Sequence, residues 1–148
     1  MAAEEPVRDT ATRVADSLAR LESDHDLWIA TANDDGAPWL VPLSFHWTGD
    51  ALLLATLRRS PTYRNLVAGG GVRIALGDTR DVVMIDGESD VPDELPAPDA
   101  DATAAASGYD PRSEAEAGYV RVIPRRVQAW RNVAEIQGRT IMRAGAWL

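Results

Sequence analysis

The chain contains 148 residues, 45% of them hydrophobic, and carries a formal net charge of −8 at pH 7. This length predicts a single domain over residues 1–148, and the negative charge argues against nucleic acid as a partner, because a phosphate backbone needs a basic surface. The chain has neither cysteine nor lysine, which excludes disulfides, thiolate metal sites and lysine Schiff bases. No apolar run approaches the ~20 residues of a membrane span and the N-terminus is acidic, so we expect a soluble, cytoplasmic protein without a membrane partner.

Hydrophobic periodicity predicts one helix near the N-terminus and a series of short strands after it. Val14, Leu18 and Leu21 recur at helical spacing, and Asp9 or Thr10 can cap the helix that carries them. Apolar runs between turn residues predict strands over residues 27–32, 39–47, 51–57, 72–76, 81–89 and 119–130, and a last element over 139–143.

The strand predicted over residues 39–47 is apolar on both faces, which suggests that both faces are buried. Pro38 and Pro42 interrupt its hydrogen bonding, so the strand should lie at a sheet edge or carry a bulge. Further along the chain, Ser60 is a favourable N-cap and Pro61 is suited to the first helical position. These two residues predict the start of a short helix.

Residues 91–118 differ from the rest in composition, because they are rich in acidic residues, alanine and proline. We expect a short helix over residues 99–107, closed by Gly108, within a solvated loop that serves either as a connector or as a mobile lid. The whole pattern has six or seven strands, two or three short helices and no regular βαβ alternation. It favours a small antiparallel barrel over a doubly wound sheet.

The segment TLRRSPTYRN, residues 56–65, is the most informative for function. Thr56 and Ser60 supply hydroxyl groups, the helix start supplies free N–H groups, and arginine matches the geometry of a phosphate. The segment therefore predicts a phosphate site, with a capped surface helix and solvated arginines as the equal alternative. The arginines concerned are Arg58, Arg59 and Arg64.

The two histidines lie far apart in the sequence and do not predict a metal site, because no carboxylate cluster at ligand spacing accompanies them. His46, between Phe45 and Trp47, is a candidate general acid or base, with packing in an apolar strand as the alternative. His25 lies in an acidic turn, where we expect it to be solvated. The sequence has no serine-triad signature and no glycine-rich dinucleotide loop.

Five tryptophans and a basic C-terminal third lead to two further expectations. The indoles form part of the core, or they stack on an aromatic ligand or on a second subunit. The C-terminal arginines bind an anionic ligand, pair with acidic segments of a second subunit, or lie solvated. They are Arg121, Arg125, Arg126, Arg131, Arg139 and Arg143.

Taken together, these features resemble the pyridoxamine 5'-phosphate oxidase-like, flavin-binding split-barrel superfamily over nearly the whole chain. The stretches RRSPTYRNL and GRTIMRAGAWL are similar to the branch that includes deazaflavin-dependent reductases. The resemblance implies a mainly β fold, a six-stranded antiparallel Greek-key split barrel, and a homodimer with the cofactor at the subunit interface. It rests on the turn at residues 35–38, Ala55-Thr56 at a strand end, Ser60 at a helix start, residues 64–66 within that helix, and Pro124, Trp130 and Arg139.

The resemblance also implies which residues bind the cofactor. Ser60 and Thr62, with Thr56, correspond to positions that bind the cofactor phosphate, and Ala55 corresponds to a backbone position near the ring. Trp130 and Arg139 correspond to contacts from the other side of the site, which we expect from the partner subunit. The other implied positions are Pro42, Leu43 and Ser44 along the isoalloxazine ring, and Arg58, Arg59, Arg64 and Asn65 in the phosphate segment.

Three departures from the oxidase pattern bear on the activity. Residues 40–45 lack the arginine and lysine of that strand, and Pro61 and Thr62 replace a lysine. The arginine and histidine that bind the substrate phosphate in the oxidase have no counterpart around Ile136 and Gln137. These departures argue against oxidation of pyridoxamine phosphate. They leave FMN, held by the arginines of the phosphate segment, and the 8-hydroxy-5-deazaflavin coenzyme as alternative cofactors.

Our first hypothesis is an oxidoreductase that transfers a hydride to or from a small organic substrate, with no catalytic side chain assigned. The second is a non-catalytic barrel that binds a cofactor or another ligand. The third is a dimeric barrel that has lost cofactor binding.

Overall fold

The chain is rich in short strands and poor in helices, and a computed structural model describes it over residues 6–148. The helices are α1 (Thr10–Ser23), α2 (Pro61–Val67), α3 (Ala97–Ser107) and the 3-10 turn η1 (Val133–Glu135). The strands are β1 (Asp26–Ala32), β2 (Pro38–Ser44), β3 (His46–Trp47), β4 (Leu52–Leu57), β5 (Val72–Leu76), β6 (Val82–Asp90), β7 (Ala117–Trp130), β8 (Thr140–Arg143) and β9 (Ala146–Trp147). Within the described range, no helix has the length and apolar character to cross a membrane.

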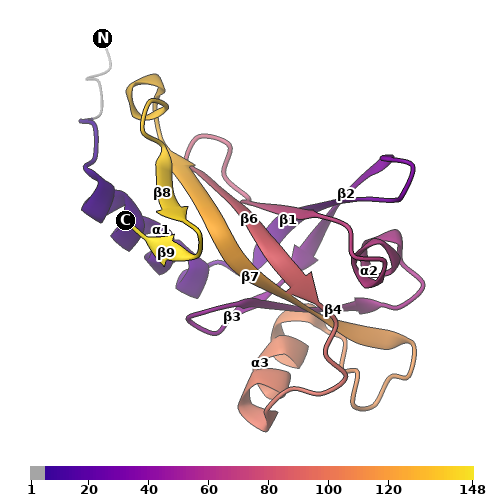
Figure 1. Cartoon of the computed structure of the whole chain (residues 1–148). Helices are drawn as coiled ribbons and strands as arrows, with labels where there is room; N and C mark the ends of the chain where they lie inside the picture. The colour runs from indigo at the N-terminus through magenta and orange to yellow at the C-terminus, as the bar shows by residue number, and fades with distance from the viewer. Residues whose placement is uncertain (1–5) are drawn as a thin grey trace.

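The strands pair antiparallel in the order β2-β1-β5-β6-β7-β4-β3, and β8 and β9 extend the sheet from β7. In Figure 1 the sheet curls, with α1 and α2 on opposite sides and α3 beneath β3 and β4. This is the predicted mainly β split barrel, but the described residues form nine strands in place of the expected six. The number rises because the predicted strand over residues 39–47 is broken and the C-terminal element forms a hairpin.

The break lies at Phe45, and it lets one segment pair with two different strands. β2 pairs with β1, whereas β3 pairs with β4. The Phe45 N–H donates to the carbonyl oxygen of His25 at 2.8 Å, and the ring is 1% exposed. The prediction of an edge strand is confirmed, but the prediction that both faces are buried is wrong for β2. Within residues 6–148 it pairs with β1 alone, and Trp39 and Leu40 are 42% and 60% exposed.

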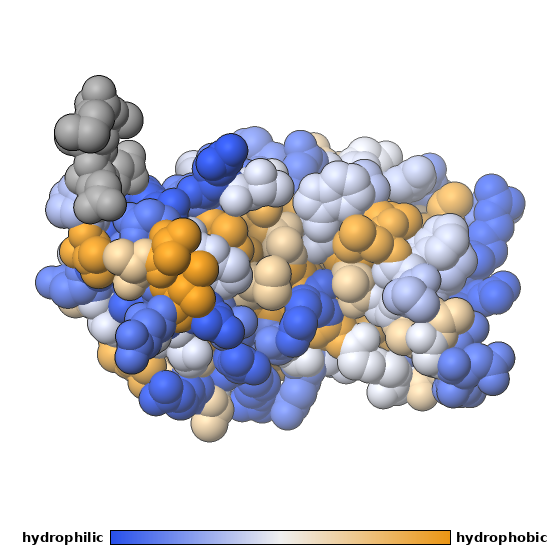
Figure 2. Space-filling view, turned by 90° about the horizontal axis from the view of Figure 1, so that it is seen from above, coloured by the Kyte–Doolittle hydropathy of each residue, from blue (hydrophilic) through white to orange (hydrophobic). Residues whose placement is uncertain are grey.

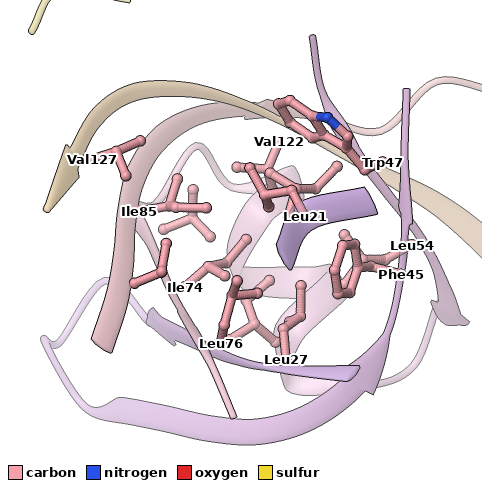
Figure 3. Packing of buried hydrophobic residues seen from close by; sticks show 14 of the residues in the cluster. Leu21, Leu27, Phe45, Trp47, Leu54, Ile74, Leu76, Ile85, Val122 and Val127 are labelled. Atoms are coloured by element: carbon pink, nitrogen blue, oxygen red, sulfur yellow. The ribbon is translucent and has the colours of Figure 1, made fainter. Parts of the chain in front are cut away.

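Hydrophobic side chains fill the inside of the curled sheet, pointing at one another from opposite walls (Figure 3). Alternate residues face inward, as in β1, where Leu27 and Ile29 are buried while Trp28 between them is 43% exposed. Leu21 of α1 and Tyr63 of α2 join the same cluster. The inside of the barrel is therefore a packed core, which leaves the rim and the outer faces as the places where a ligand can bind.

β7 continues through Pro124, where the sequence predicts a break. The pairing with β6 skips one residue there, because Asp86 pairs with Arg126 while Gly87 pairs with Pro124. A Cβ on Gly87 would lie 2.5 Å from the carbonyl oxygen of Ile123, so this close approach of the strands needs glycine. The bulge accommodates the missing N–H of the proline and lets the strand run on.

The acidic segment, residues 91–118, contains the predicted helix and packs against the barrel. α3 ends at Gly108, which has the left-handed φ of 74° that favours glycine. Ala100 on this helix is 1% exposed and forms a small cluster with Ala55 of β4 and Tyr119 of β7. The segment therefore covers the outer face of β4 and β7. The sequence predicted a solvated loop around the helix and did not predict this packing.

A buried carboxylate joins the N-terminal segment to the turn after β7. The Glu135 side chain is fully buried and accepts the backbone N–H groups of Arg8 at 2.8 Å and Arg131 at 2.7 Å. The Arg8 guanidinium lies 2.9 Å from the same carboxylate. Hydrogen bonding from Arg8, and then from the backbone, lowers the pKa of Glu135 from 4.5 to about 2.

We expect Glu135→Gln to destabilise the fold by about 2–4 kcal/mol at pH 7, because Arg8 loses its buried partner. The pKa of Glu135 is lower in the folded than in the unfolded state, so this contribution is present above about pH 4.5 and is lost as the pH falls toward 2. Urea unfolding of the wild type and the variant at several pH values measures the difference. Glu22→Gln, at an exposed position, is the control, and equal stabilities at pH 7 would contradict the expectation.

Candidate functional site

The start of α2 follows β4 closely and has the predicted capping geometry. Ser60 has an extended backbone and its Oγ accepts the N–H of Tyr63 at 3.2 Å, while Pro61 occupies the first helical position. The cap satisfies one free N–H of the helix, and a proline at that position costs no hydrogen bond. Because Ser60 acts here as an acceptor, its own hydroxyl hydrogen can still be donated to a ligand.

The three arginines of the phosphate segment differ in how they are held. The Arg58 side chain donates from Nε to the carbonyl oxygen of Ala117 at 3.0 Å and lies 5.8 Å from the centre of the Tyr63 ring. Arg59 and Arg64 are exposed, and their side chains make no hydrogen bond or ion pair within residues 6–148. Arg58 therefore holds α2 against β7, whereas Arg59 and Arg64 are left to attract an anion.

The other residues assigned to the phosphate end lie close to α2 but are largely covered. Thr56 and Thr62 are 6% and 1% exposed, and the Thr62 hydroxyl has no partner among the described residues. The Asn65 amide donates to the Thr31 hydroxyl at 3.0 Å, which ties α2 to β1. Ala55, predicted to lie near the cofactor ring, is buried beneath α3.

The three assigned residues of β2 face in alternate directions. Leu43 packs toward the core, while Pro42 is exposed on the outer face, beside Trp28 of β1. The hydroxyl of Ser44 donates to the carboxylate of Asp26 at 2.7 Å. The outer face of β2 and β1 is therefore open and partly apolar, as a surface that contacts a flat ligand or a second subunit would be.

Trp130 and Arg139 lie together, but far along β7 from the phosphate segment. The Arg139 guanidinium lies 5.9 Å from the centre of the Trp130 ring, in cation–π contact. Thr56 pairs with Gly118, and Trp130 follows Gly118 by twelve residues on the same strand. At about 3.3 Å per residue this is roughly 40 Å of strand. Figure 1 shows α2 and β8 toward opposite ends of β7.

Both histidines line one cavity. Their distance apart in the sequence gave no indication that they lie close together. The cavity, of about 640 Å³, lies between the end of α1, β3 and α3, with His25 and His46 in its wall. The Nε2 atom of His46 lies 3.9 Å from a carboxylate oxygen of Asp99. Within the described part of the chain, no group of three or more His, Cys, Asp or Glu side chains has metal-binding geometry.

Three of the six C-terminal arginines are paired with acidic residues of their own chain. Arg121 pairs with Asp90, and Arg125 lies 2.9 Å from Glu88, both across the β6–β7 ladder. Arg131 lies 3.2 Å from Asp81. These arginines therefore do not need acidic segments of a second subunit as partners, and Arg139 is the one that accompanies an aromatic ring.

The model of the pyridoxamine 5'-phosphate oxidase family matches residues 16–137, so the chain belongs to that family. No curated protein matches the sequence. The matched range includes the capped helix at the end of β4 and Trp130, and it ends before Arg139.

Three solved structures illustrate the range of proteins with this fold. An F420 reductase has a TM-score of 0.58 at 22% identity, covering 74% of this chain and 93% of its own. An FAD-binding protein from Mesorhizobium loti has a TM-score of 0.63 at 20% identity, covering 77% and 89%. A haem storage protein from Vibrio cholerae has a TM-score of 0.64 at 11% identity, covering 90% and 99%. At these identities the likeness establishes the fold.

We expect Gly118→Ala to displace α2, because a Cβ at Gly118 would lie 2.5 Å from Cε2 of the Tyr63 ring. The expected cost is about 1–3 kcal/mol, the range for overpacking a close contact. Gly71→Ala is the matched control, since a Cβ there meets nothing within 4 Å. Urea unfolding gives the stability of both variants, and a Gly118→Ala variant as stable as the control would disprove the close contact.

Proposed function

We propose that this protein is a flavin- or deazaflavin-dependent oxidoreductase that transfers a hydride between the bound cofactor and a small organic substrate. FMN is the cofactor we favour, with the 8-hydroxy-5-deazaflavin coenzyme as the alternative. The cofactor supplies the redox chemistry, and the chain binds and orients it and excludes water. Family membership and the F420- and FAD-related structures support a cofactor of this type.

The observation that carries the proposal is the unpaired basic group at the start of α2. Arg59 and Arg64 are exposed without an ion pair in the described structure, beside the Ser60 hydroxyl. The buried Thr62 hydroxyl, which has no partner there, is a further donor. Arginine side chains and hydroxyl groups are suited to phosphate oxygens, so the residues present fit a phosphate-bearing cofactor.

These arginines can also replace the positive charges that the oxidase pattern has and this chain lacks. β2 lacks the arginine and lysine expected there, and Pro61 and Thr62 stand where the oxidase carries a lysine. Arg59 and Arg64 supply two positive charges from the α2 side of the site, and these two charges replace the missing ones. We do not propose pyridoxamine phosphate as the substrate, because the residues of the oxidase pattern named above are missing.

We propose further that the protein is a homodimer with the cofactor at the subunit interface. Trp130 and Arg139 lie roughly 40 Å of strand away from the phosphate segment, a span that one mononucleotide cofactor does not bridge. A cofactor that contacts both groups therefore takes them from two copies of the chain. The first copy supplies the phosphate segment, and the second supplies the Trp130–Arg139 pair.

Exposed apolar residues support the same arrangement. Trp28 and Leu40 are 43% and 60% exposed on the outer face of β1 and β2, next to Pro42. Figure 2 shows hydrophobic residues reaching the surface in patches among hydrophilic ones on the face that it presents. Large exposed side chains of this kind are common at subunit interfaces.

A second candidate function is binding of a cofactor or another ligand without turnover. It is favoured by the absence, among the residues assigned to the site, of any side chain that titrates near neutral pH. The likeness to a haem storage protein is also consistent with it. Reduction of the bound cofactor by a hydride donor, followed by reoxidation by an acceptor, separates the two candidates.

Arg59→Ala and Arg64→Ala should each weaken FMN binding by about 1–3 kcal/mol, which is roughly 5- to 150-fold in Kd. Titration with FMN and with the deazaflavin coenzyme, followed by tryptophan fluorescence, measures both affinities. Arg80→Ala removes another exposed arginine, from the turn before β6, and should leave binding unchanged. If all three variants bind alike, the phosphate site does not lie at α2.

The shared site can be tested by mixing two variants that each weaken cofactor binding. Arg59→Ala and Arg139→Ala each spoil both sites of their own homodimer, but a mixed dimer contains one intact site. Equal mixing, after dissociation and reassociation, makes about half of the dimers mixed, so we expect it to restore about one quarter of the wild-type number of intact sites. Mixing Arg59→Ala with Arg64→Ala should restore nothing, because both changes fall on the same half-site. Restoration by the second mixture, or by neither, would contradict the arrangement.

A further inference from the structure

The hydroxyl group of Tyr119 is buried without a hydrogen-bond partner among the described residues. Tyr119 is 2% exposed, and its side chain packs with Ala55 of β4 and Ala100 of α3. Burial raises the pKa of the phenol, so the group is neutral at physiological pH. A buried hydroxyl with no partner lowers the stability of the folded state by about 1–3 kcal/mol. A ligand that forms a hydrogen bond to it would recover part of this free energy.

A cavity of about 420 Å³ lies against Tyr119, within the acidic segment that the proposed function does not use. Asp93, Glu94 and Leu95 form one side, and Pro111 and Arg112 form the other. Tyr119, which carries the unpartnered hydroxyl, is itself one of the residues that line this cavity. The unpartnered group and the cavity are thus parts of one place in the fold.

The charges around the cavity favour a cation. Arg112 is held by Asp110 at 3.0 Å and by Asp101 at 2.8 Å, and these contacts occupy its guanidinium. Asp93 and Glu94 line the same cavity and make no ion pair within residues 6–148. Four carboxylates therefore stand against one guanidinium, so an anion would meet net negative charge and no free basic group.

We propose that this cavity binds an alkylammonium group. An ammonium has three N–H donors, of which one is donated to the Tyr119 Oη and the others to the carboxylates of Asp93 and Glu94. The hydrocarbon part lies against Leu95 and Pro111. The site uses none of the residues assigned to cofactor phosphate binding, so it does not depend on the proposed redox function.

Isothermal titration calorimetry of the full-length protein with n-butylammonium chloride tests the proposal. Butan-1-ol and sodium butanoate, which share the hydrocarbon chain, are the neutral and anionic controls. We expect binding of the ammonium alone, weakening as the salt concentration rises, because part of the attraction is between exposed charges. Absence of ammonium binding, or equal binding of butanoate, would overturn the proposal.

Tyr119→Phe removes the hydroxyl and keeps the ring, and we expect it to weaken ammonium binding at least tenfold. Its thermal midpoint without ligand should be no lower than that of the wild type, since the hydroxyl has no partner to lose. Tyr109→Phe is the matched control, because Tyr109 is 37% exposed and does not line the cavity. Unchanged binding by Tyr119→Phe would refute the role of the hydroxyl.

A double variant, Asp93→Asn with Glu94→Gln, tests the carboxylates separately and keeps the proposal falsifiable if Tyr119→Phe does not fold. Both residues are exposed, so the fold should be unaffected, and we expect at least a tenfold loss of ammonium affinity. Full retention of affinity would overturn the proposal. FMN titration of the same variants should match the wild type, so failure of the ammonium site and failure of the cofactor site are told apart.

Discussion

The hydrogen bonding of β7 to three other strands constrains most of the remaining structure. Its first residues pair with β4, most of its length pairs with β6, and its end pairs with β8. Gly118 on this strand receives the ring of Tyr63, which seats α2 at one end, and Trp130 lies at the other end. Because the strand keeps its ladder through the bulge at Pro124, the two groups stay apart within one chain. In the proposed homodimer, this separation makes the partner necessary.

Seven of the fifteen arginines of this acidic protein form ion pairs within the described residues. Arg121 lies directly opposite Asp90 in the β6–β7 ladder, where opposite charges on paired strands attract, and Arg125, at the bulge, pairs with Glu88 of β6. Arg112 is held in the same way within the acidic segment. Among the arginines without a carboxylate partner in the described residues, Arg59 and Arg64 are the ones that lie at the start of α2. Near Tyr119 the carboxylates outnumber the basic groups, so the proposed site there favours a cation.

Local features of the molecule were predictable wherever neighbouring residues alone decide the geometry. Ser60 and Pro61 start α2 because a hydroxyl cap and a fixed φ suit that position in any context. Gly108 ends α3 because the left-handed conformation favours glycine. Pro38 and Pro42 place β2 at an edge because proline lacks the N–H that a central strand needs. The barrel class followed from the order of such elements and from the family resemblance.

Other features depend on which segments meet, and no local pattern in the sequence contains that information. The apolar composition of β2 suggested burial of both faces. Burial is set by neighbouring layers, however, and β2 has one strand partner in the part of the chain that the structure describes. The bend at Phe45 follows from its hydrogen bond to His25, which also brings His25 and His46 to one cavity. The isolation of the Tyr119 hydroxyl arises only when α3 and the acidic segment close over β7. Sequence alone therefore decided caps, turns and strand composition, because these depend on interactions between residues that are adjacent in the chain. The tertiary structure decided exposure, charge pairing and cavities, because these are energies of contacts between residues far apart in the chain.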